Sequence, residues 1–203
     1  MKYGIIDVGG GLRGIYGAGV LDRCLEEKVA FDCCIGVSAG SANMTSYLAG
    51  QHGRNKPFYD EYSFRKEYMS VKNLVKKHSY LDLDYVYGVL SNRGGENPLD
   101  YPAMMENPAE LVVVAADART GKPRYFTKED TKQDDYRILM ASCCIPVVEQ
   151  PIVIEGTPYY DGGLADPVPL EKALERGCDR VAVILTKPVA AEGENRRDEK
   201  LSR

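Results

Sequence analysis

A serine lies midway between two glycines in the segment Gly36–Gly40, which reads Gly-Val-Ser-Ala-Gly. The pattern Gly-x-Ser-x-Gly is typical of a nucleophile on a sharp turn between a strand and a helix. Residues 32–37 predict a buried strand and residues 39–48 predict a helix, so the motif has that context. Such a turn exposes Ser38 as a candidate nucleophile at the carboxyl end of the sheet, with the backbone N–H of Ala39 nearby. The alternative is a close-packed turn without chemistry.

A glycine-rich segment, Gly9–Gly14, reads Gly-Gly-Gly-Leu-Arg-Gly and follows a predicted strand at residues 3–8. It contains Gly-x-Gly-x-x-Gly, the pattern of a dinucleotide site. Such a site needs an acidic residue at the end of the second strand, whereas Asp32 lies at its beginning. Consecutive glycines can also turn backbone N–H groups toward one point beside a helix N-terminus, where they stabilise an oxyanion. A tight turn that binds nothing is the third interpretation.

A serine needs a neighbouring base to act as a nucleophile at neutral pH. The sequence holds two histidines, His52 and His78, and neither lies in the later half of the chain, where the order of an α/β-hydrolase triad requires one. We therefore expect both to be surface residues. The other candidate bases are carboxylates at predicted strand ends or in loops, and spacing does not choose among them: Asp7, Asp117, Asp161 and Asp166.

These groups can meet only if the chain brings several strand ends to one edge of a sheet. Alternating buried strands and helices predict an α/β domain with a parallel sheet and right-handed crossovers. We expect strands at 3–8, 32–37, 111–116, 124–127 and 180–185, and helices at 12–27, 39–48, 136–142 and 169–176. Residues 152–154 and 158–160 flank a turn and predict a hairpin. We interpret residues 1–203 as one domain with a polar tail at 189–203.

Residues 54–106 interrupt this alternation, and their polar, tyrosine-rich sequence with weak helical periodicity near 58–77 predicts a helical insertion. Between residues 54 and 78, seven Lys or Arg stand against three acidic residues. Aromatic residues are interleaved with them: Phe58, Tyr59, Tyr62, Phe64 and Tyr68. A basic, aromatic surface could make weak contact with an anionic membrane. The alternative, which we favour, is a helix pair that packs its rings inward.

The composition argues against several other classes. A net charge of −4 is not that of a dedicated nucleic-acid binder. No segment reaches the roughly 18 apolar residues of a membrane span, and the first residues lack the apolar region of a signal peptide. The six cysteines form no Cys-x-x-Cys metal pattern, which favours reduced thiols in a cytoplasmic protein. Cys143 and Cys144 have no later histidine to activate them, so we reject them as nucleophiles.

Three blocks taken in order resemble the patatin-like phospholipase family, including its bacterial cytoplasmic members. They are Gly9–Gly14, Gly36–Gly40 and Asp161–Gly163, the last reading Asp-Gly-Gly. The segment Ala141–Pro146 is similar to the one that precedes the family's catalytic aspartate. The resemblance covers residues 3–188 and implies a three-layer fold, in which a central, mostly parallel sheet is flanked by helices.

The resemblance further implies a catalytic dyad without histidine, in which Ser38 attacks an ester carbonyl and Asp161 accepts the serine proton. The oxyanion hole would come from backbone amides of the glycine loop and the turn: Gly9, Gly10, Gly11 and Ala39. Arg13 and Gly14 would support the loop. We expect a serine hydrolase of acyl-lipid esters, phospholipid or lysophospholipid, that needs no cofactor or metal. The alternative is a catalytically weak or regulatory acyl-binding protein of the same fold.

This sequence departs from the family after the Asp-Gly-Gly block. Family members commonly carry an asparagine there, whereas this chain reads Asp166-Pro167. The substrate headgroup and the acyl chain length therefore cannot be carried over from the resemblance.

Overall fold

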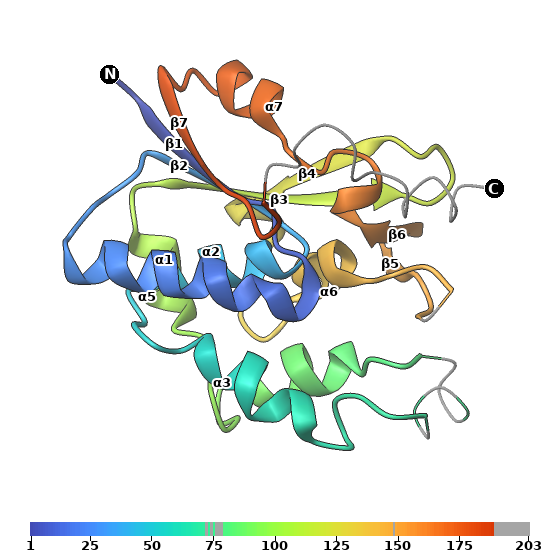
Figure 1. Cartoon of the computed structure of the whole chain (residues 1–203). Coiled ribbons are helices and arrows are strands. Elements are labelled where there is room, and N and C mark those ends of the chain that lie inside the picture. The colour runs from blue at the N-terminus through green and yellow to red at the C-terminus, as the bar shows by residue number, and fades with distance from the viewer. Residues whose placement is uncertain (72, 74, 76–78, 148, 189–203) are drawn as a thin grey trace.

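The computed structural model describes residues 1–71, 73, 75, 79–147 and 149–188, and it centres on one seven-stranded sheet (Figure 1). Four strands run parallel: β1 (Tyr3–Asp7), β2 (Cys33–Val37), β3 (Glu110–Asp117) and β7 (Arg180–Ile184). Three strands make antiparallel pairs: β4 (Pro123–Thr127) and β6 (Thr157–Asp161) with β3, and β5 (Ile152–Ile154) with β6. The predicted strands and hairpin are all present, and the central sheet is mostly parallel, as the resemblance implies, with antiparallel pairs at β4, β5 and β6.

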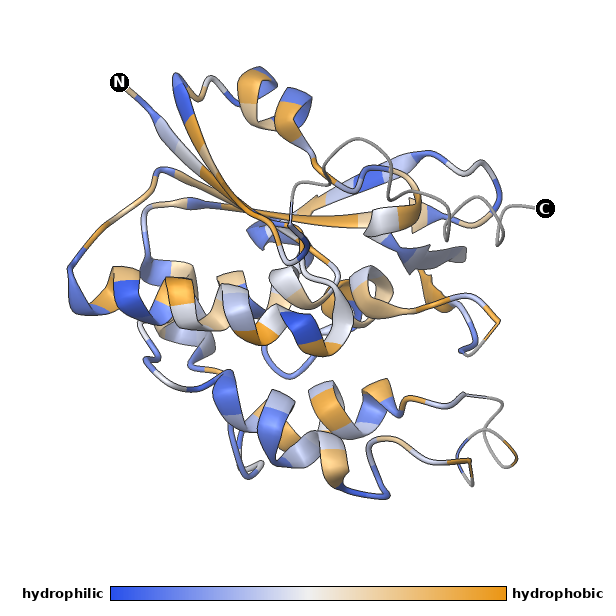
Figure 2. Cartoon of the chain, in the orientation of Figure 1, coloured by the Kyte–Doolittle hydropathy of each residue, from blue (hydrophilic) through white to orange (hydrophobic). Residues whose placement is uncertain are grey.

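The central strands are hydrophobic over most of their length, as expected for a sheet whose two faces are both covered by helices (Figure 2). Every residue of β2 is buried, and so are six consecutive residues of β3. One face carries the helices α1 (Ile15–Glu26), α2 (Ala39–Leu48), α5 (Tyr101–Glu106) and α6 (Arg137–Cys143). The helix α7 (Leu170–Glu175) covers the other face. The fold is therefore the three-layer α/β architecture that the sequence predicts.

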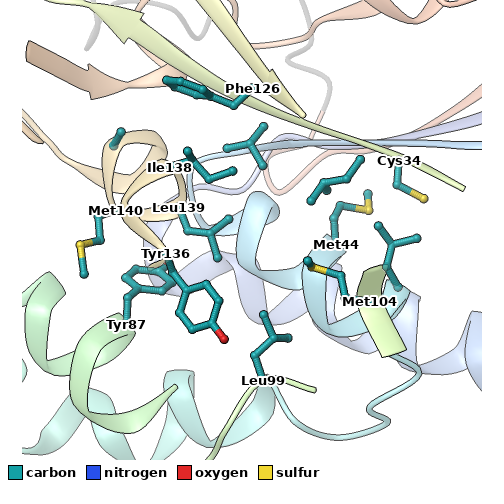
Figure 3. Close-up of a cluster of buried hydrophobic side chains, with 14 of the residues drawn as sticks. Cys34, Met44, Tyr87, Leu99, Met104, Phe126, Tyr136, Ile138, Leu139 and Met140 are labelled. Atoms are coloured by element: carbon teal, nitrogen blue, oxygen red, sulfur yellow. The ribbon is translucent and has the colours of Figure 1, made fainter. Parts of the chain in front are cut away.

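Two clusters of buried side chains lie on the two faces of the sheet. The larger joins α1, α2 and α6 to the sheet through residues such as Leu21, Met44 and Leu139, several of which Figure 3 shows. The smaller packs Ala173 of α7 against the sheet. Since a fully buried Leu or Ile side chain contributes about 1.5–3 kcal/mol, these clusters hold the strand ends rigidly in place.

The insertion at residues 54–106 is helical but broken into short pieces, and α3 and η3 lie beyond the layer of α1 and α2 (Figure 1). Its described residues include α3 (Lys56–Asp60), a 3-10 turn η2 (Tyr62–Phe64), a π-helical segment η3 (Asp84–Leu90), and α5. The periodicity expected near 58–77 does not give one helix, because Glu61 and Arg65 take non-helical backbone angles. The predicted tail at 189–203 lies outside the described residues. Within them, no helix combines the length and apolar character that crossing a bilayer requires.

Candidate active site

The pairing of β3 brings two distant segments of the chain together. β2 pairs with residues 110–114 of β3, and β6 pairs with residues 115–117. β4 pairs with residues 112–116, so it occupies the opposite edge of β3 from both. β2 and β6 therefore share one edge and approach each other from opposite directions. Val37 is opposite Val114 of β3, and Asp161 is opposite the next residue, Ala115. Ser38, which follows Val37, therefore lies beside Asp161 at this edge.

Ser38 lies at this junction on a strained turn between β2 and α2. Its backbone has φ 55° and ψ −135°, a combination that costs a non-glycine residue about 1–3 kcal/mol and is found at functional sites. The turn is fixed by hydrogen bonds: the Ser38 N–H donates to Ser142 Oγ at 2.9 Å, and Ser41 donates both its N–H and its hydroxyl to the Ser38 carbonyl. Only glycine fits at position 36, because a methyl group there would lie 2.3 Å from Ser41 Cα.

Asp161 ends β6 and faces Ser38. One carboxylate oxygen accepts the Gly163 N–H at 2.8 Å, and the Ser38 side chain lies close enough to the same carboxylate to favour its charged form. Burial raises the pKa of Asp161, while the Ser38 side chain and the Gly163 N–H oppose that rise. A carboxylate with few donors, held against a serine hydroxyl, is suited to accept that hydroxyl's proton.

The glycine loop packs directly onto the serine turn. Gly9, Gly10 and Gly11 have φ values of 64°, 119° and 59°, a run of left-handed residues that only glycine adopts at little cost. A methyl group at Gly9 would lie 2.3 Å from the Val37 carbonyl oxygen, so the two loops touch. Gly11 begins the 3-10 turn η1 (Gly11–Gly14), where backbone amides have no partner within the helix.

The expectation that Gly9 supplies an oxyanion donor is wrong. Its N–H donates to Asp7 Oδ1 at 3.0 Å, so it is directed into the protein and away from Ser38. The candidate donors that remain are the amides of Gly10, Gly11 and Ala39, the last at the first position of α2.

The two residues expected to support the loop do lie against it. The Arg13 guanidinium covers Gly10, with Nη2 3.4 Å from where a methyl group would project. Gly14 is buried and closes η1 against Tyr59 and Ala39, where a side chain would clash with the Tyr59 hydroxyl at 2.8 Å.

An apolar pocket of about 300 Å³ opens beside Ser38. Gly11, Leu12 and Ala39 line it together with Ser38 itself. The insertion provides much of the remaining wall, largely with aromatic and aliphatic side chains: Phe58, Tyr59, Tyr68, Leu83, Val86 and Tyr87. The sequence predicts that the aromatic rings of this segment pack inward. Four of them do, namely Phe58, Tyr59, Tyr62 and Tyr68, whereas Phe64 is 82% exposed.

The other candidate bases do not face Ser38. Asp7 is fully buried beneath the glycine loop. Asp117 accepts two backbone N–H groups of the turn that follows β3, and Asp166 accepts the Tyr125 hydroxyl at 2.7 Å. His52 is an exposed residue that contacts Glu26 at 2.9 Å, as expected, while His78 lies outside the described residues.

The dinucleotide interpretation gains no support from the position of Asp32. This residue precedes β2 at the edge of the sheet opposite the glycine loop, where its carboxylate accepts the Tyr3 N–H at 2.7 Å. Cys143 lines the pocket, but burial raises its pKa, which keeps the thiol protonated and agrees with its rejection as a nucleophile.

Sequence reasoning missed a second buried carboxyl near the site. Glu149 is 4% exposed, and burial, with a contribution from the charge of Asp161, raises its pKa to about 7. Its Oε2 accepts the Ile145 N–H at 2.6 Å, which closes the loop between α6 and β5 next to the pocket. The signal that could have revealed it is a single acidic residue in a mostly apolar stretch, Ile145–Pro151.

Comparison with known proteins bears on the family and the fold of the chain. YjjU of Escherichia coli (strain K12), an uncharacterized protein, is 28% identical over 196 residues, which are 92% of this chain and 52% of YjjU. The structure of VipD from Legionella pneumophila superposes on 99% of this chain and 52% of its own length, with a TM-score of 0.51 and 17% identity. The chain thus spans about half the length of each of these two proteins. The family model described as "Patatin-like phospholipase" matches residues 8–174, and the chain belongs to that family.

Proposed function

We propose that this chain is a serine acyl hydrolase that cleaves the carboxylic ester bonds of acyl lipids, phospholipid or lysophospholipid, with Ser38 as nucleophile and Asp161 as base. The observation that carries the proposal is the juxtaposition of Ser38 and Asp161, set by the register of β2 and β6 on β3, beside an apolar pocket that Ser38 lines. Membership in the patatin-like phospholipase family supports a lipid ester as substrate.

In the proposed first half-reaction the Ser38 oxygen attacks the ester carbonyl while its proton passes to Asp161. The carbonyl oxygen gains negative charge, which the amides of Gly10, Gly11 and Ala39 stabilise as donors fixed in advance. The tetrahedral intermediate collapses, the C–O bond to the alcohol breaks, and Asp161 returns the proton to the departing alkoxide. The products are an acyl ester of Ser38 and a free alcohol.

In the second half-reaction water replaces the alcohol. Asp161 takes a proton from the water as it attacks the acyl ester, and the same amides stabilise the second oxyanion. The proton then moves to the Ser38 oxygen as the acid leaves. The apolar pocket suits the acyl chain, because its walls are aromatic and aliphatic and burial of each CH₂ contributes about 0.8 kcal/mol.

The test is hydrolysis of p-nitrophenyl esters of graded acyl length, combined with labelling by a fluorophosphonate probe. We expect turnover to increase with chain length until the pocket is filled, and the probe to label Ser38 and to leave the Ser38→Ala variant unlabelled. Labelling without turnover would favour the acyl-binding alternative. No labelling and no turnover would refute the hydrolase.

We also propose that the insertion makes weak contact with an anionic membrane through residues 54–78. The support is local: Phe64 is 82% exposed and Val71 is 69% exposed, close in sequence to the exposed Lys66. Four other aromatic rings of the segment face inward, so the contact rests on few side chains.

In liposome flotation, Phe64→Ser is expected to lower partition onto anionic vesicles by about tenfold, since transfer of an exposed Phe contributes about 1.5–3 kcal/mol. The matched control is Val153→Ser, which removes an exposed apolar residue from β5. Equal flotation of the wild type on neutral and anionic vesicles would count against the proposal.

A further inference from the structure

Beneath the glycine loop lies a buried polar cluster that the proposed reaction does not use. It consists of Asp7 at the end of β1, Asn43 in the middle of α2, and Tyr59 from the insertion. Asp7 and Asn43 are both 0% exposed. Buried polar groups of this kind are costly unless every partner is provided, so a cluster in the core next to a strained loop calls for a role.

The Asp7 carboxylate occupies a space that two glycines, Gly17 and Gly40, leave open. A methyl group at Gly17 of α1 would lie 2.3 Å from Asp7 Oδ2, and a methyl group at Gly40 of α2 would lie 2.9 Å from its Cγ. The carboxylate is therefore packed against two helices close to their N-terminal ends, where an anion is favoured. Burial raises the pKa of Asp7, and the bonds from Asn43 and Gly9 oppose that rise.

Asn43 joins the two ends of the glycine loop. Its Nδ2 donates to Asp7 Oδ2 at 2.8 Å and to the Gly14 carbonyl oxygen at 2.9 Å. Asp7 in turn accepts the Gly9 N–H at 3.0 Å through its other oxygen. The first and last glycines of the loop are thus tied to one amide group, directly at Gly14 and through the carboxylate at Gly9.

Tyr59 fixes the orientation of that amide. Its hydroxyl donates to Asn43 Oδ1 at 2.8 Å, so the Nδ2 group must face Asp7 and Gly14. The Tyr59 ring also lines the acyl pocket. The insertion therefore contacts the glycine loop through a chain of hydrogen bonds as well as forming the wall of the pocket.

We propose that Asn43, oriented by Tyr59, is a positioning residue that holds the glycine loop in the conformation needed for oxyanion stabilisation. The inference rests on the proposed hydrolase function. Three successive residues with positive φ form a loop that other contacts must fix, and the cluster of Asp7, Asn43 and Tyr59 supplies those contacts at both ends. Neither Asn43 nor Tyr59 touches the reacting atoms, so both act through the loop.

Tyr59→Phe tests this inference, because it removes one hydroxyl and keeps the ring in the pocket wall. We expect kcat for a short p-nitrophenyl ester and the rate of fluorophosphonate labelling to fall by roughly 5-fold to 100-fold, the range for a small misplacement of catalytic groups. KM should stay within twofold. Asn43→Ala should lose more activity than Tyr59→Phe. If Asn43→Ala fails to fold, the kcat and labelling rate of Tyr59→Phe still test the inference.

The matched control is Tyr47→Phe. Tyr47 is a buried tyrosine on α2, the helix that carries Asn43, and its hydroxyl donates to the Val29 carbonyl at 2.6 Å, away from the loop. Both variants lose one hydroxyl hydrogen bond and should show a similar fall in Tm, but only Tyr59→Phe should lose kcat. Equal kcat and equal labelling rates in the two variants would overturn the inference.

A second measurement separates this inference from the proposed function. Hydrogen exchange followed by mass spectrometry reports on the amides of Gly9 and Arg13, both of which are hydrogen-bonded within the loop region. We expect these amides to exchange faster in Tyr59→Phe than in Tyr47→Phe even if the wild type proves to have no esterase activity. Unchanged exchange would refute the positioning role, whereas absent wild-type turnover with faster exchange would refute only the hydrolase.

Discussion

Asp161→Asn is expected to lower kcat for p-nitrophenyl ester hydrolysis by about 10⁶-fold, the loss seen when the general base of a serine triad is removed. The asparagine keeps the shape of the side chain and can still accept the Gly163 N–H, so the fold should not change. What it loses is the ability to take the Ser38 proton. Circular dichroism and the unfolding midpoint check the fold, and the burst and steady-state phases of the ester assay give kcat.

His52→Ala is the control for this variant, because His52 is exposed and bound only to Glu26 among the described residues. It should retain wild-type kcat. Activity of Asp161→Asn within tenfold of the wild type would refute the dyad. Ser38→Ala should lose at least as much activity as Asp161→Asn, and the double variant little more than either, since groups that act as one unit do not contribute additively.

The same assignment fixes the sign of the pH dependence. A general base works only when ionised, so kcat/KM should fall as the pH drops through the pKa of Asp161, which burial raises. Glu149 also titrates near the site, with a pKa of about 7. Glu149→Gln separates the two: if Asp161 is the base, the loss of activity at acid pH persists in this variant.

Local sequence patterns were enough to predict the order of strands and helices. The runs at residues 32–37 and 111–116 are apolar without alternation, which is typical of strands buried on both faces, and both are central strands of the sheet. The turn at Ser38 was predictable for a related reason, since tight approach to its neighbours leaves room only for glycine at positions 36 and 40.

Pairing between distant strands was not predictable from the same patterns. Four aspartates lie at strand ends or in loops, and the residues around each give no reason to prefer one. The antiparallel register of β6, which sets Asp161 opposite Ala115, decides which carboxylate reaches Ser38. Only the ordered set of family motifs pointed to Asp161 in advance, because register depends on contacts more than forty residues apart.

The error at Gly9 has a similar origin. A run of glycines predicts that backbone amides can converge, but not which of them a neighbouring side chain will capture. Asp7, two residues earlier, takes the Gly9 amide because Asn43 from another element holds the carboxylate in place. Residues that act by positioning carry no motif of their own: Asn43 and Tyr59 look in the sequence like a helical amide and one of fourteen tyrosines.

Gly40→Ala is expected to destabilise the protein by about 3 kcal/mol, at the upper end for overpacking, because the added methyl group has no room to move into. It would lie 2.2 Å from the Asp7 carbonyl oxygen, which belongs to the backbone of a central strand. Either α2 or β1 must shift. Since α2 begins directly after Ser38 and β1 leads into the glycine loop, either shift also separates the nucleophile from its oxyanion donors.

Gly19→Ala in α1 provides the contrast, since no heavy atom lies within 4 Å of the position its methyl group would take. Alanine favours an exposed helix position over glycine by about 1 kcal/mol, so this variant should be slightly stabilised and keep its kcat. Urea unfolding followed by circular dichroism measures both variants. A midpoint for Gly40→Ala equal to that of the wild type would mean that the close packing of α2 on β1, and with it the rigid placement of Ser38 against the glycine loop, is not maintained in solution.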